Sequence, residues 1–244
     1  MLKNLINKVG LAVFMLLIVT GCKKGEAQQK VLVFSKTTGF RHDNIEKGAE
    51  TIKRLGSAHG FAVDHSEDAL LFTDERLAQY DAVVFLSTTG TLFNDDQKAA
   101  FMRYIQAGNG FVGIHAASDT EYEWPWYGRM VGAYFMSHPQ VQDADIHVVD
   151  KSHLATQHLP DVWTRKDEWY DFRDLNGEVK LLMKLDEQTY EGGKMGDHHP
   201  IAWYHEYDGG RAFYTALGHT KESFDEPEFL NHIVGGIRYA MGLE

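Results

Sequence analysis

The sequence predicts an α/β fold with a parallel sheet that helices cover on both faces. Short apolar segments alternate with amphipathic helical segments through the first half of the chain, an order typical of parallel sheets. Residues 82–86 are apolar at every position, as in a strand that is buried on both faces. Asp208, Gly209 and Gly210 form a turn sequence between two apolar segments and predict an added β-hairpin region.

The first half of the chain is predicted to supply four strands and two helices. The strands are expected at residues 31–34, 61–63, 82–86 and 111–114. Asp43 and Glu46 form a capping box that would begin the first helix, and Gly60 would end it. Asn94 and Gln97 form a second capping box. Apolar residues at helical spacing would face the core: Ile45, Ala49, Ile52 and Leu55, then Phe101, Tyr104 and Ile105.

The second half of the chain has a looser pattern. Strands are expected at residues 141–149, 179–185, 201–206 and 211–217, with a long connection between the first two. Asp225 and Glu228 would cap a last helix. Its core stripe would comprise Leu230, Ile233, Val234, Ile237 and Met241.

The N-terminus has the pattern of a bacterial lipoprotein signal. Lys3 and Lys8 precede a short apolar segment at residues 11–19, which ends near Cys22, and the segment is too short to be a comfortable membrane span. Cleavage before Cys22 would leave its thiol available for attachment to lipid. An ordinary secretory signal, with Cys22 incidental, is the alternative.

This interpretation divides the chain into a signal peptide (residues 1–21), a tether (22–29) and a folded domain (30–242). The protein would then lie in the bacterial cell envelope, anchored by lipid on the periplasmic face or the cell surface. The precursor carries a formal charge of −11, and loss of a signal with two lysines and no acidic residue would leave −13. Such a charge argues against nucleic acid as a partner and against electrostatic adhesion to anionic lipid.

The single cysteine excludes an intramolecular disulfide and a catalytic thiolate in the folded domain. His115 is the strongest functional candidate, because it directly follows the strand expected at residues 111–114. Ligands bind outside the carboxyl ends of strands in open α/β sheets. Near a carboxylate such as Asp119 or Glu168, this imidazole could act as a general base or a metal ligand. The alternative is a core histidine that is hydrogen-bonded to the backbone.

Other candidates lie at loops that should meet His115. Arg41 and His42 lie at a helix N-terminus, where free N–H groups favour an anion or a polar ligand oxygen; simple solvent exposure is the alternative for His42. His219 follows a hairpin strand, and His138 lies in the irregular middle of the chain. Together, His115, His138 and His219 could bind a divalent metal such as zinc, nickel or iron, although no compact metal motif is present.

Two tryptophans in a loop after the His115 turn could bind a sugar. Trp124 and Trp126 flank a proline, and flat apolar rings cover the C–H face of sugars while nearby polar groups bind the hydroxyls. Ordinary core packing is the alternative. These residues predict a small-molecule carbohydrate as the ligand.

Four segments resemble the ThuA-like, or trehalose-utilisation, family: residues 38–42, 108–117, 200–203 and 211–219. The resemblance implies a flavodoxin-like sheet of the class I glutamine amidotransferase type. It also implies a role in sugar metabolism, with 3-keto-glycosides as one substrate class. His42, His115, His138 and His219 match recurrent polar positions of the family. Amidotransferases carry a nucleophilic cysteine where this chain has His115, so a thioester mechanism is excluded.

Three functions are therefore expected in order of preference. The first is a lipid-anchored enzyme that acts on a glycoside or 3-keto-glycoside by histidine and carboxylate chemistry, with or without a divalent metal, as a hydrolase, lyase or isomerase. The second is a non-catalytic, sugar-binding lipoprotein that keeps the cleft. The third is a flavin protein, suggested by Ser and Thr residues at 35–39. The sequence makes no prediction of oligomeric state.

Overall fold

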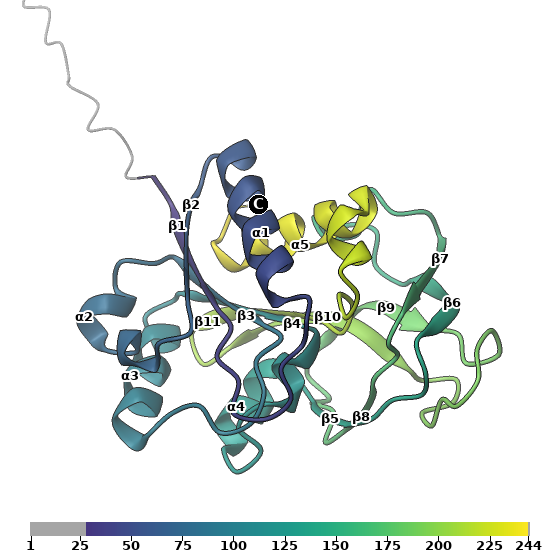
Figure 1. Ribbon diagram of the computed structural model, residues 1–244, viewed down its shortest axis with the longest axis horizontal. Helices are drawn as coiled ribbons and strands as arrows, with labels where there is room; N and C mark the ends of the chain where they lie inside the picture. Colours follow the sequence, from purple (N-terminus) through teal and green to yellow (C-terminus); the bar gives the residue numbers. More distant parts are fainter. Residues whose placement is uncertain (1–27, 244) are drawn as a thin grey trace, which may run out of the picture.

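A nine-stranded mixed sheet organises the protein (Figure 1). The structure, a computed structural model, describes residues 28–243, so the predicted signal peptide, Cys22 and most of the tether lie outside the described residues. The strand order is β2-β1-β3-β4-β11-β10-β9-β6-β7. No helix within residues 28–243 has the length and apolar character needed to cross a bilayer.

Five parallel strands form one half of the sheet: the four predicted from the first half of the chain, and β11 from the predicted hairpin, which pairs in parallel with β4. Their bounds are β1 (Lys30–Phe34), β2 (Ala62–Ser66), β3 (Ala82–Leu86), β4 (Gly110–Ile114) and β11 (Gly210–Thr215). β3 and β4 are buried at every position, as expected of strands covered on both faces. The order reverses between β1 and β3, and in doubly wound sheets ligands bind near such a reversal, outside the carboxyl ends of the strands.

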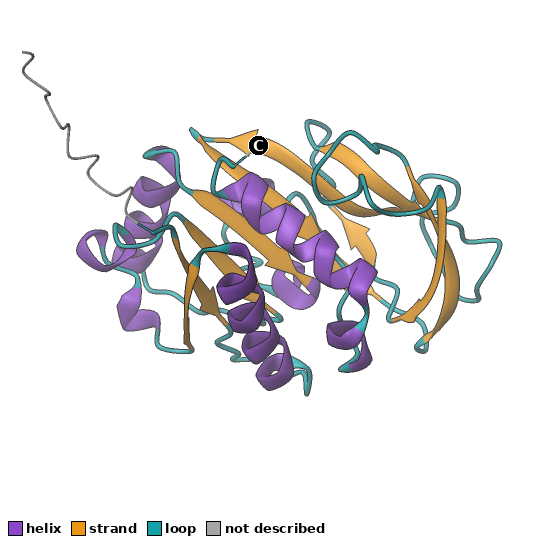
Figure 2. Ribbon diagram, turned by 90° about the horizontal axis from the view of Figure 1, so that it is seen from above, coloured by secondary structure: helices purple, strands orange, loops and turns teal. Residues whose placement is uncertain are grey.

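Helices cover both faces of this sheet, as predicted. α1 (Ile45–His59) and α5 (Pro227–Ala240) lie on one face, where Figure 2 shows them side by side with the strands behind. α2 (Asp74–Leu77), α3 (Asp95–Gln106) and α4 (Pro125–Val131) lie on the other face (Figure 1). Short 3₁₀ turns complete the helical structure: η1 (Ala69–Leu71), η2 (His115–Asp119) and η3 (Glu222–Asp225).

The region added to the parallel sheet is larger than a hairpin. It comprises the antiparallel strands β10 (Pro200–Tyr207), β9 (Lys180–Leu185), β6 (Gln142–Val148) and β7 (Val162–Asp167), and a small separate sheet of β5 (Tyr134–Ser137) and β8 (Asp171–Arg173). The hairpin turn itself is confirmed, because Asp208 and Gly209 both adopt a positive φ between β10 and β11. β7 was missed, since Arg165 and Asp167 occupy two of its buried positions and conceal its alternation.

One of the three predicted capping boxes is confirmed and two are not. Asn94 and Gln97 exchange both hydrogen bonds at the start of α3. The cap of α1 is Asn44, whose amide donates to Ser87 and to the Gly218 carbonyl instead of capping the helix. The cap of α5 is Glu226, which makes no side-chain capping bond and pairs with Arg165. The acidic residues predicted as caps, Asp43 and Asp225, lie one position before these and make ion pairs with Lys221 and Lys47 instead.

Candidate active site

A cavity of about 390 Å³ lies at the edge of the sheet where the parallel strands end. It is lined by Phe40, His42, Asp119, Phe135, His138, Glu168, Tyr170 and His219. His42 and His219 follow β1 and β11. Glu168 follows β7, which runs in the same direction as β11 because four successive antiparallel pairings separate them. The fold therefore delivers side chains from both halves of the sheet to one edge.

His115 lies behind this cavity in a left-handed backbone conformation, with φ of +52°, which is uncommon for a residue other than glycine. Its side chain is fully buried, and Nδ1 donates to the carbonyl of Ala216 at 2.8 Å. Nε2 points at His219 Nδ1, 3.0 Å away, and lies 3.5 Å from Glu168 Oε2. The strand-tip position predicted for His115 is thus confirmed, and the imidazole faces other site residues and not the core.

Glu168 connects three histidines. Its Oε2 lies 3.0 Å from His219 Nδ1, and its Oε1 lies 3.0 Å from His138 Nδ1. Burial on its own would raise the pKa of Glu168, but hydrogen bonds and charge from His115 and His219 outweigh it and hold the pKa well below its usual range. Glu168 is therefore an anion at neutral pH and draws positive charge toward this cluster.

The pKa values of two histidines move in opposite directions. Burial would lower the pKa of His219, but its hydrogen bond to the Glu168 carboxylate and the charge of that group raise it instead. Burial, followed by repulsion from His115 and His219, lowers the pKa of His42 to about 3. His42 is 5% exposed, and its Nδ1 has no hydrogen-bond partner among residues 28–243. Its neutral ring nitrogen is available as an electron-pair donor.

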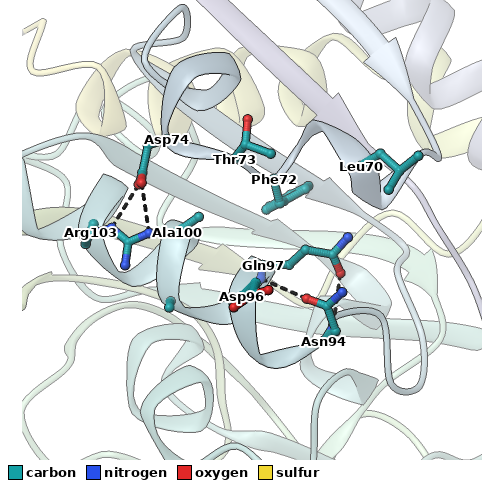
Figure 3. Close-up of a pocket in the computed structure, with 10 residues that line it drawn as sticks. Leu70, Phe72, Thr73, Asp74, Asn94, Asp96, Gln97, Ala100 and Arg103 are labelled. Atoms are coloured by element: carbon teal, nitrogen blue, oxygen red, sulfur yellow. Dashed lines mark hydrogen bonds and ion pairs between the residues drawn. The ribbon is translucent and has the colours of Figure 1, made fainter.

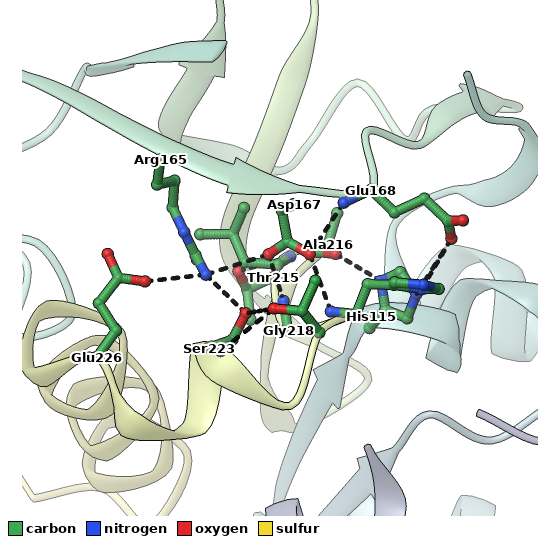
Figure 4. A network of polar contacts seen from close by, with 12 residues as sticks. His115, Arg165, Asp167, Glu168, Thr215, Ala216, Gly218, Ser223 and Glu226 are labelled. Atoms are coloured by element: carbon green, nitrogen blue, oxygen red, sulfur yellow. Dashed lines mark hydrogen bonds and ion pairs between the residues drawn. The ribbon is translucent and has the colours of Figure 1, made fainter. Parts of the chain in front are cut away.

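A second buried carboxylate, that of Asp167, holds the backbone of His219 and Glu168 in place (Figure 4). Asp167 is fully buried and accepts hydrogen bonds from the amides of Gly218, His219 and Glu168 at 2.8, 3.0 and 3.0 Å. Its charge is compensated by Arg165, 3.2 Å away. Asp167 thus ties the His219 turn to the residue that carries the central carboxylate.

Asp119 is the other acidic group of the cavity. The hydroxyl of Tyr122 donates to it at 2.6 Å, yet burial outweighs this bond and raises the pKa of Asp119. The cavity therefore contains one carboxylate held as an anion, Glu168, and one that is easier to protonate, Asp119.

Three predicted binding residues lie away from the cavity. Arg41 is an exposed residue whose guanidinium pairs with Glu46 and Glu67, both at 2.8 Å. Trp124 and Trp126 are buried and stacked on each other. Trp126 Nε1 donates to Asp208 in the β10–β11 turn, at the opposite end of β11 from His219. Core packing, the alternative stated for the tryptophans, accounts for this placement.

Two further groups of polar residues lie elsewhere in the structure. Within each group the side chains pair with one another, which leaves few hydrogen-bond donors for a ligand. A cavity of about 430 Å³ between α2 and α3 (Figure 3) contains the Asn94–Gln97 capping box and the Asp74–Arg103 ion pair. His199 is fully buried and is bonded to Glu187 and to the Tyr170 carbonyl.

Two hydroxyl groups of the loop that suggested a flavin phosphate site, those of Ser35 and Thr38, are hydrogen-bonded within the protein. Ser35 Oγ is bonded to His65, and Thr38 Oγ1 donates to the carbonyls of Thr89 and Thr91. The hydroxyls of Ser35 and Thr38 therefore already have protein partners, and the structure adds no support to the flavin hypothesis.

Sequence reasoning missed four residues that shape the site. Asp167 was hidden in the unpredicted strand β7, although an acidic pair before two aromatic residues was visible at 167–170. Phe40, Phe135 and Tyr170 line the cavity, but isolated aromatic residues carry no local signal that separates a ligand contact from core.

The chain matches the family model described as ThuA, trehalose utilisation, over residues 30–240. It is similar to a ThuA-like protein from Bacteroides uniformis, with 23% identity, a TM-score of 0.75 and coverage of 87% of this chain and 91% of the other. A ThuA-like protein from Parabacteroides merdae gives 22% identity, a TM-score of 0.74 and coverage of 88% and 90%.

Fold similarity extends to part of a larger enzyme. A β-galactosidase from Bacillus circulans sp. alkalophilus has 10% identity and a TM-score of 0.59, over 88% of this chain and 31% of the other. None of the curated proteins matches the sequence. The match to the family model spans nearly the whole described region, and the two ThuA-like structures share the fold over almost their full length. The chain therefore belongs to the ThuA, or trehalose-utilisation, family.

Proposed function

We propose that this protein is an enzyme that processes a small carbohydrate by proton transfer in the cavity at the strand ends. The observation that carries the proposal is that three imidazoles and two carboxylates, from segments far apart in the chain, line that cavity, with the buried imidazole of His115 directly behind them. Buried ionisable groups are costly unless they are paired or used. Membership of the trehalose-utilisation family supports a sugar as the substrate.

The two carboxylates are suited to different roles. The pKa of Asp119 is raised by burial, whereas the histidines hold the pKa of Glu168 low. Pairs of groups whose environments push their pKa values apart are typical of general acid and general base assignments. Asp119 would donate a proton to the leaving or enolic oxygen of the substrate, and Glu168 would stabilise positive charge on the adjacent histidines.

Aromatic faces at the cavity fit a sugar ring. Phe40 is 68% exposed and packs edge-on against His42, with the ring centroids 4.9 Å apart. Phe135 and Tyr170 lie with their ring centroids 4.3 Å apart on the wall of the cavity. Flat apolar rings beside convergent polar groups are the usual composition of a site for a small polar ligand. These three residues replace Trp124 and Trp126 as the proposed platform.

The proposed chemistry is hydrolysis, elimination or isomerisation of a glycoside or 3-keto-glycoside. Each requires proton transfer next to a sugar oxygen, which Asp119 and the histidine cluster could supply. None of these reactions requires a nucleophilic cysteine. The single cysteine of the sequence is Cys22, in the N-terminal segment.

A panel of glycosides and 3-keto-glycosides, with product analysis, tests the proposal on the full chain. Asp119→Asn and Glu168→Gln should each lower kcat/KM by at least about 100-fold, the usual size of a proton-transfer contribution. His59→Ala, which changes an exposed histidine in the last turn of α1, is the control and should leave kcat/KM unchanged. Calorimetric binding of a sugar with no turnover would instead support the non-catalytic alternative.

We also propose that Cys22 carries the lipid that holds the protein in the cell envelope. The support is the N-terminal sequence pattern, with Lys3 and Lys8 before an apolar segment that ends near Cys22. Cys22→Ser should prevent incorporation of labelled fatty acid and release the protein from membranes. Equal labelling of both proteins would contradict this assignment.

A further inference from the structure

Four donor groups, three of which line the cavity, form a compact cluster that has the composition of a metal site. His42, His115, His219 and Glu168 each offer one ligand atom, and these atoms all lie within 4.8 Å of one another. We propose that they bind a single divalent transition-metal ion. The use of this ion in turnover depends on the function proposed above, whereas its binding does not.

The distances between donor atoms fit one shared ion. His115 Nε2 and His219 Nδ1 are 3.0 Å apart, and Glu168 Oε2 lies 3.0 Å from the His219 nitrogen and 3.5 Å from the His115 nitrogen. Ligands held about 2.0–2.2 Å from one ion, at angles of about 90–110°, lie roughly 3.0–3.5 Å from each other. This triangle of atoms could therefore accept an ion with little movement of its side chains.

Without a cation, the three atoms of this triangle have too few protons among them for each lone pair to accept a hydrogen bond. His115 Nδ1 carries the proton donated to the Ala216 carbonyl, so the neutral ring presents a bare Nε2 to the cluster. His219 Nδ1 can give only one proton, but two acceptors lie against it, His115 Nε2 and Glu168 Oε2. A metal ion would satisfy all three atoms together. A backbone carbonyl on the far nitrogen is the usual support of a metal-bound histidine.

His42 provides a second, independent observation. Its side chain is more than nine-tenths buried, and Nδ1 has no hydrogen-bond partner within the described chain. The ring lies perpendicular to those of His115 and His219, with centroids 4.8 and 5.3 Å away. Buried nitrogens in native proteins nearly always have a partner. One nitrogen of the His42 ring lies within 4.8 Å of the other three donor atoms, where a bound ion would give this ring a partner.

His138 is not part of the donor set, which corrects the metal ligands expected from the sequence. Its side chain is 42% exposed, and Nδ1 faces the Pro139 carbonyl and the other carboxylate oxygen of Glu168, Oε1. His42 and Glu168 take its place beside His115 and His219. Three imidazoles and one carboxylate suit zinc, nickel, cobalt, iron or manganese better than calcium or magnesium, which prefer oxygen ligands.

The cluster is held in place before any ion binds. Asp167 fixes the amides of His219 and Glu168 (Figure 4), and His115 keeps a backbone conformation that few residues other than glycine adopt. His42, His219 and Glu168 also line the cavity, so an open coordination position would face the substrate. A bound ion there could polarise a sugar hydroxyl or keto oxygen, which favours substrates that carry such an oxygen next to the reacting carbon.

Metal binding can be measured on the full chain in detergent, after chelation. Zn²⁺, Ni²⁺, Co²⁺ and Mn²⁺ are titrated separately, and bound metal is counted by elemental analysis. At least one of them should bind at one ion per chain, and Co²⁺ should show the visible absorption of nitrogen and oxygen ligation. Glu168→Gln and His115→Ala should no longer bind one ion per chain where the wild type is saturated. His138→Ala and His59→Ala should still do so.

Circular dichroism checks that each protein is folded, and if His115→Ala does not fold, the nearly isosteric Glu168→Gln decides the result. The proposal is overturned if folded wild type binds none of the four ions, or if Glu168→Gln binds them as the wild type does. One bound ion without turnover would support the metal site and contradict the enzyme. Full turnover by a protein that binds none of the ions would support the enzyme and overturn the metal site.

Discussion

Replacing Asp167 with asparagine should destabilise the protein by roughly 3–5 kcal/mol. The variant keeps the size of the side chain but removes its charge. Asp167 Oδ2 accepts from the Gly218 amide at 2.8 Å, and an asparagine NH₂ at this atom would face that donor, at a cost of about 1.5–3 kcal/mol. The buried guanidinium of Arg165 would keep only Glu226 as a counter-charge, which accounts for the remainder.

Urea denaturation at pH 7, followed by circular dichroism, measures this change as a shift in midpoint at constant slope. Asp161→Asn is the matched control, because Asp161 pairs with Lys151 on the exposed surface, and the free energy of unfolding should not change. Asp167→Asn should also weaken binding of the metal ion, because the amide of His219 loses its charged acceptor. A loss below about 1 kcal/mol would refute the view that Asp167 holds the site together.

Three further changes test other parts of the structure. Phe40→Ala should raise KM for the sugar about 3- to 10-fold through loss of ring contact, without lowering the thermal midpoint, because Phe40 is 68% exposed; an unchanged KM would remove it from the platform. Gly132→Ala should cost at least about 2 kcal/mol in urea denaturation, since φ is +98° and the new Cβ would meet Trp203 Nε1; a neutral effect would contradict this packing. Burial lowers the pKa of His232 to about 3, so the folded state resists protonation and stability falls as the pH drops below about 6.5. His232→Asn, which keeps a donor for the Ala155 carbonyl, should lose about 2 kcal/mol less than wild type between pH 6.5 and 5; equal slopes would refute the assignment.

Hydrophobic periodicity and the residue types at turns were sufficient to predict the strands of the parallel half of the sheet. The strand at residues 82–86 is apolar throughout, and the structure buries every position of β3. The hairpin turn at Asp208 and Gly209 was also predictable, since its residue types tolerate a positive φ. These features are local, so the residues that specify them lie within a few positions of one another.

Prediction was weaker where a polar side chain serves a distant partner. Asn44 caps no backbone group because it bridges to Ser87 and Gly218. Arg165 and Asp167 break the apolar alternation of β7 because, besides pairing with each other, they bind Glu226 and the Gly218 amide, which are both far away in the sequence. A pattern read along the chain cannot identify such partners, which lie more than 40 residues away for Asn44.

The site shows the same division. Histidines at strand ends were identifiable from sequence, because the edge at which parallel strands end is set by their direction. Which of them share a donor cluster depended on packing: His42 and Glu168 join His115 and His219, whereas His138 lines the cavity with its side chain 42% exposed. The exposure of each ring and the pairing of Glu168 follow from contacts between both halves of the sheet.

Local residue patterns were therefore enough to specify the α/β class, the family resemblance and the histidine at the strand tip, because backbone preference and burial periodicity act over short segments. Long-range packing set the strand order and the carboxylate that contacts the histidines. It also placed the two tryptophans in the core instead of at the cavity. Charge compensation and donor geometry depend on atoms brought together from Glu168, His219 and His42, and these distances exist only once the chain has folded.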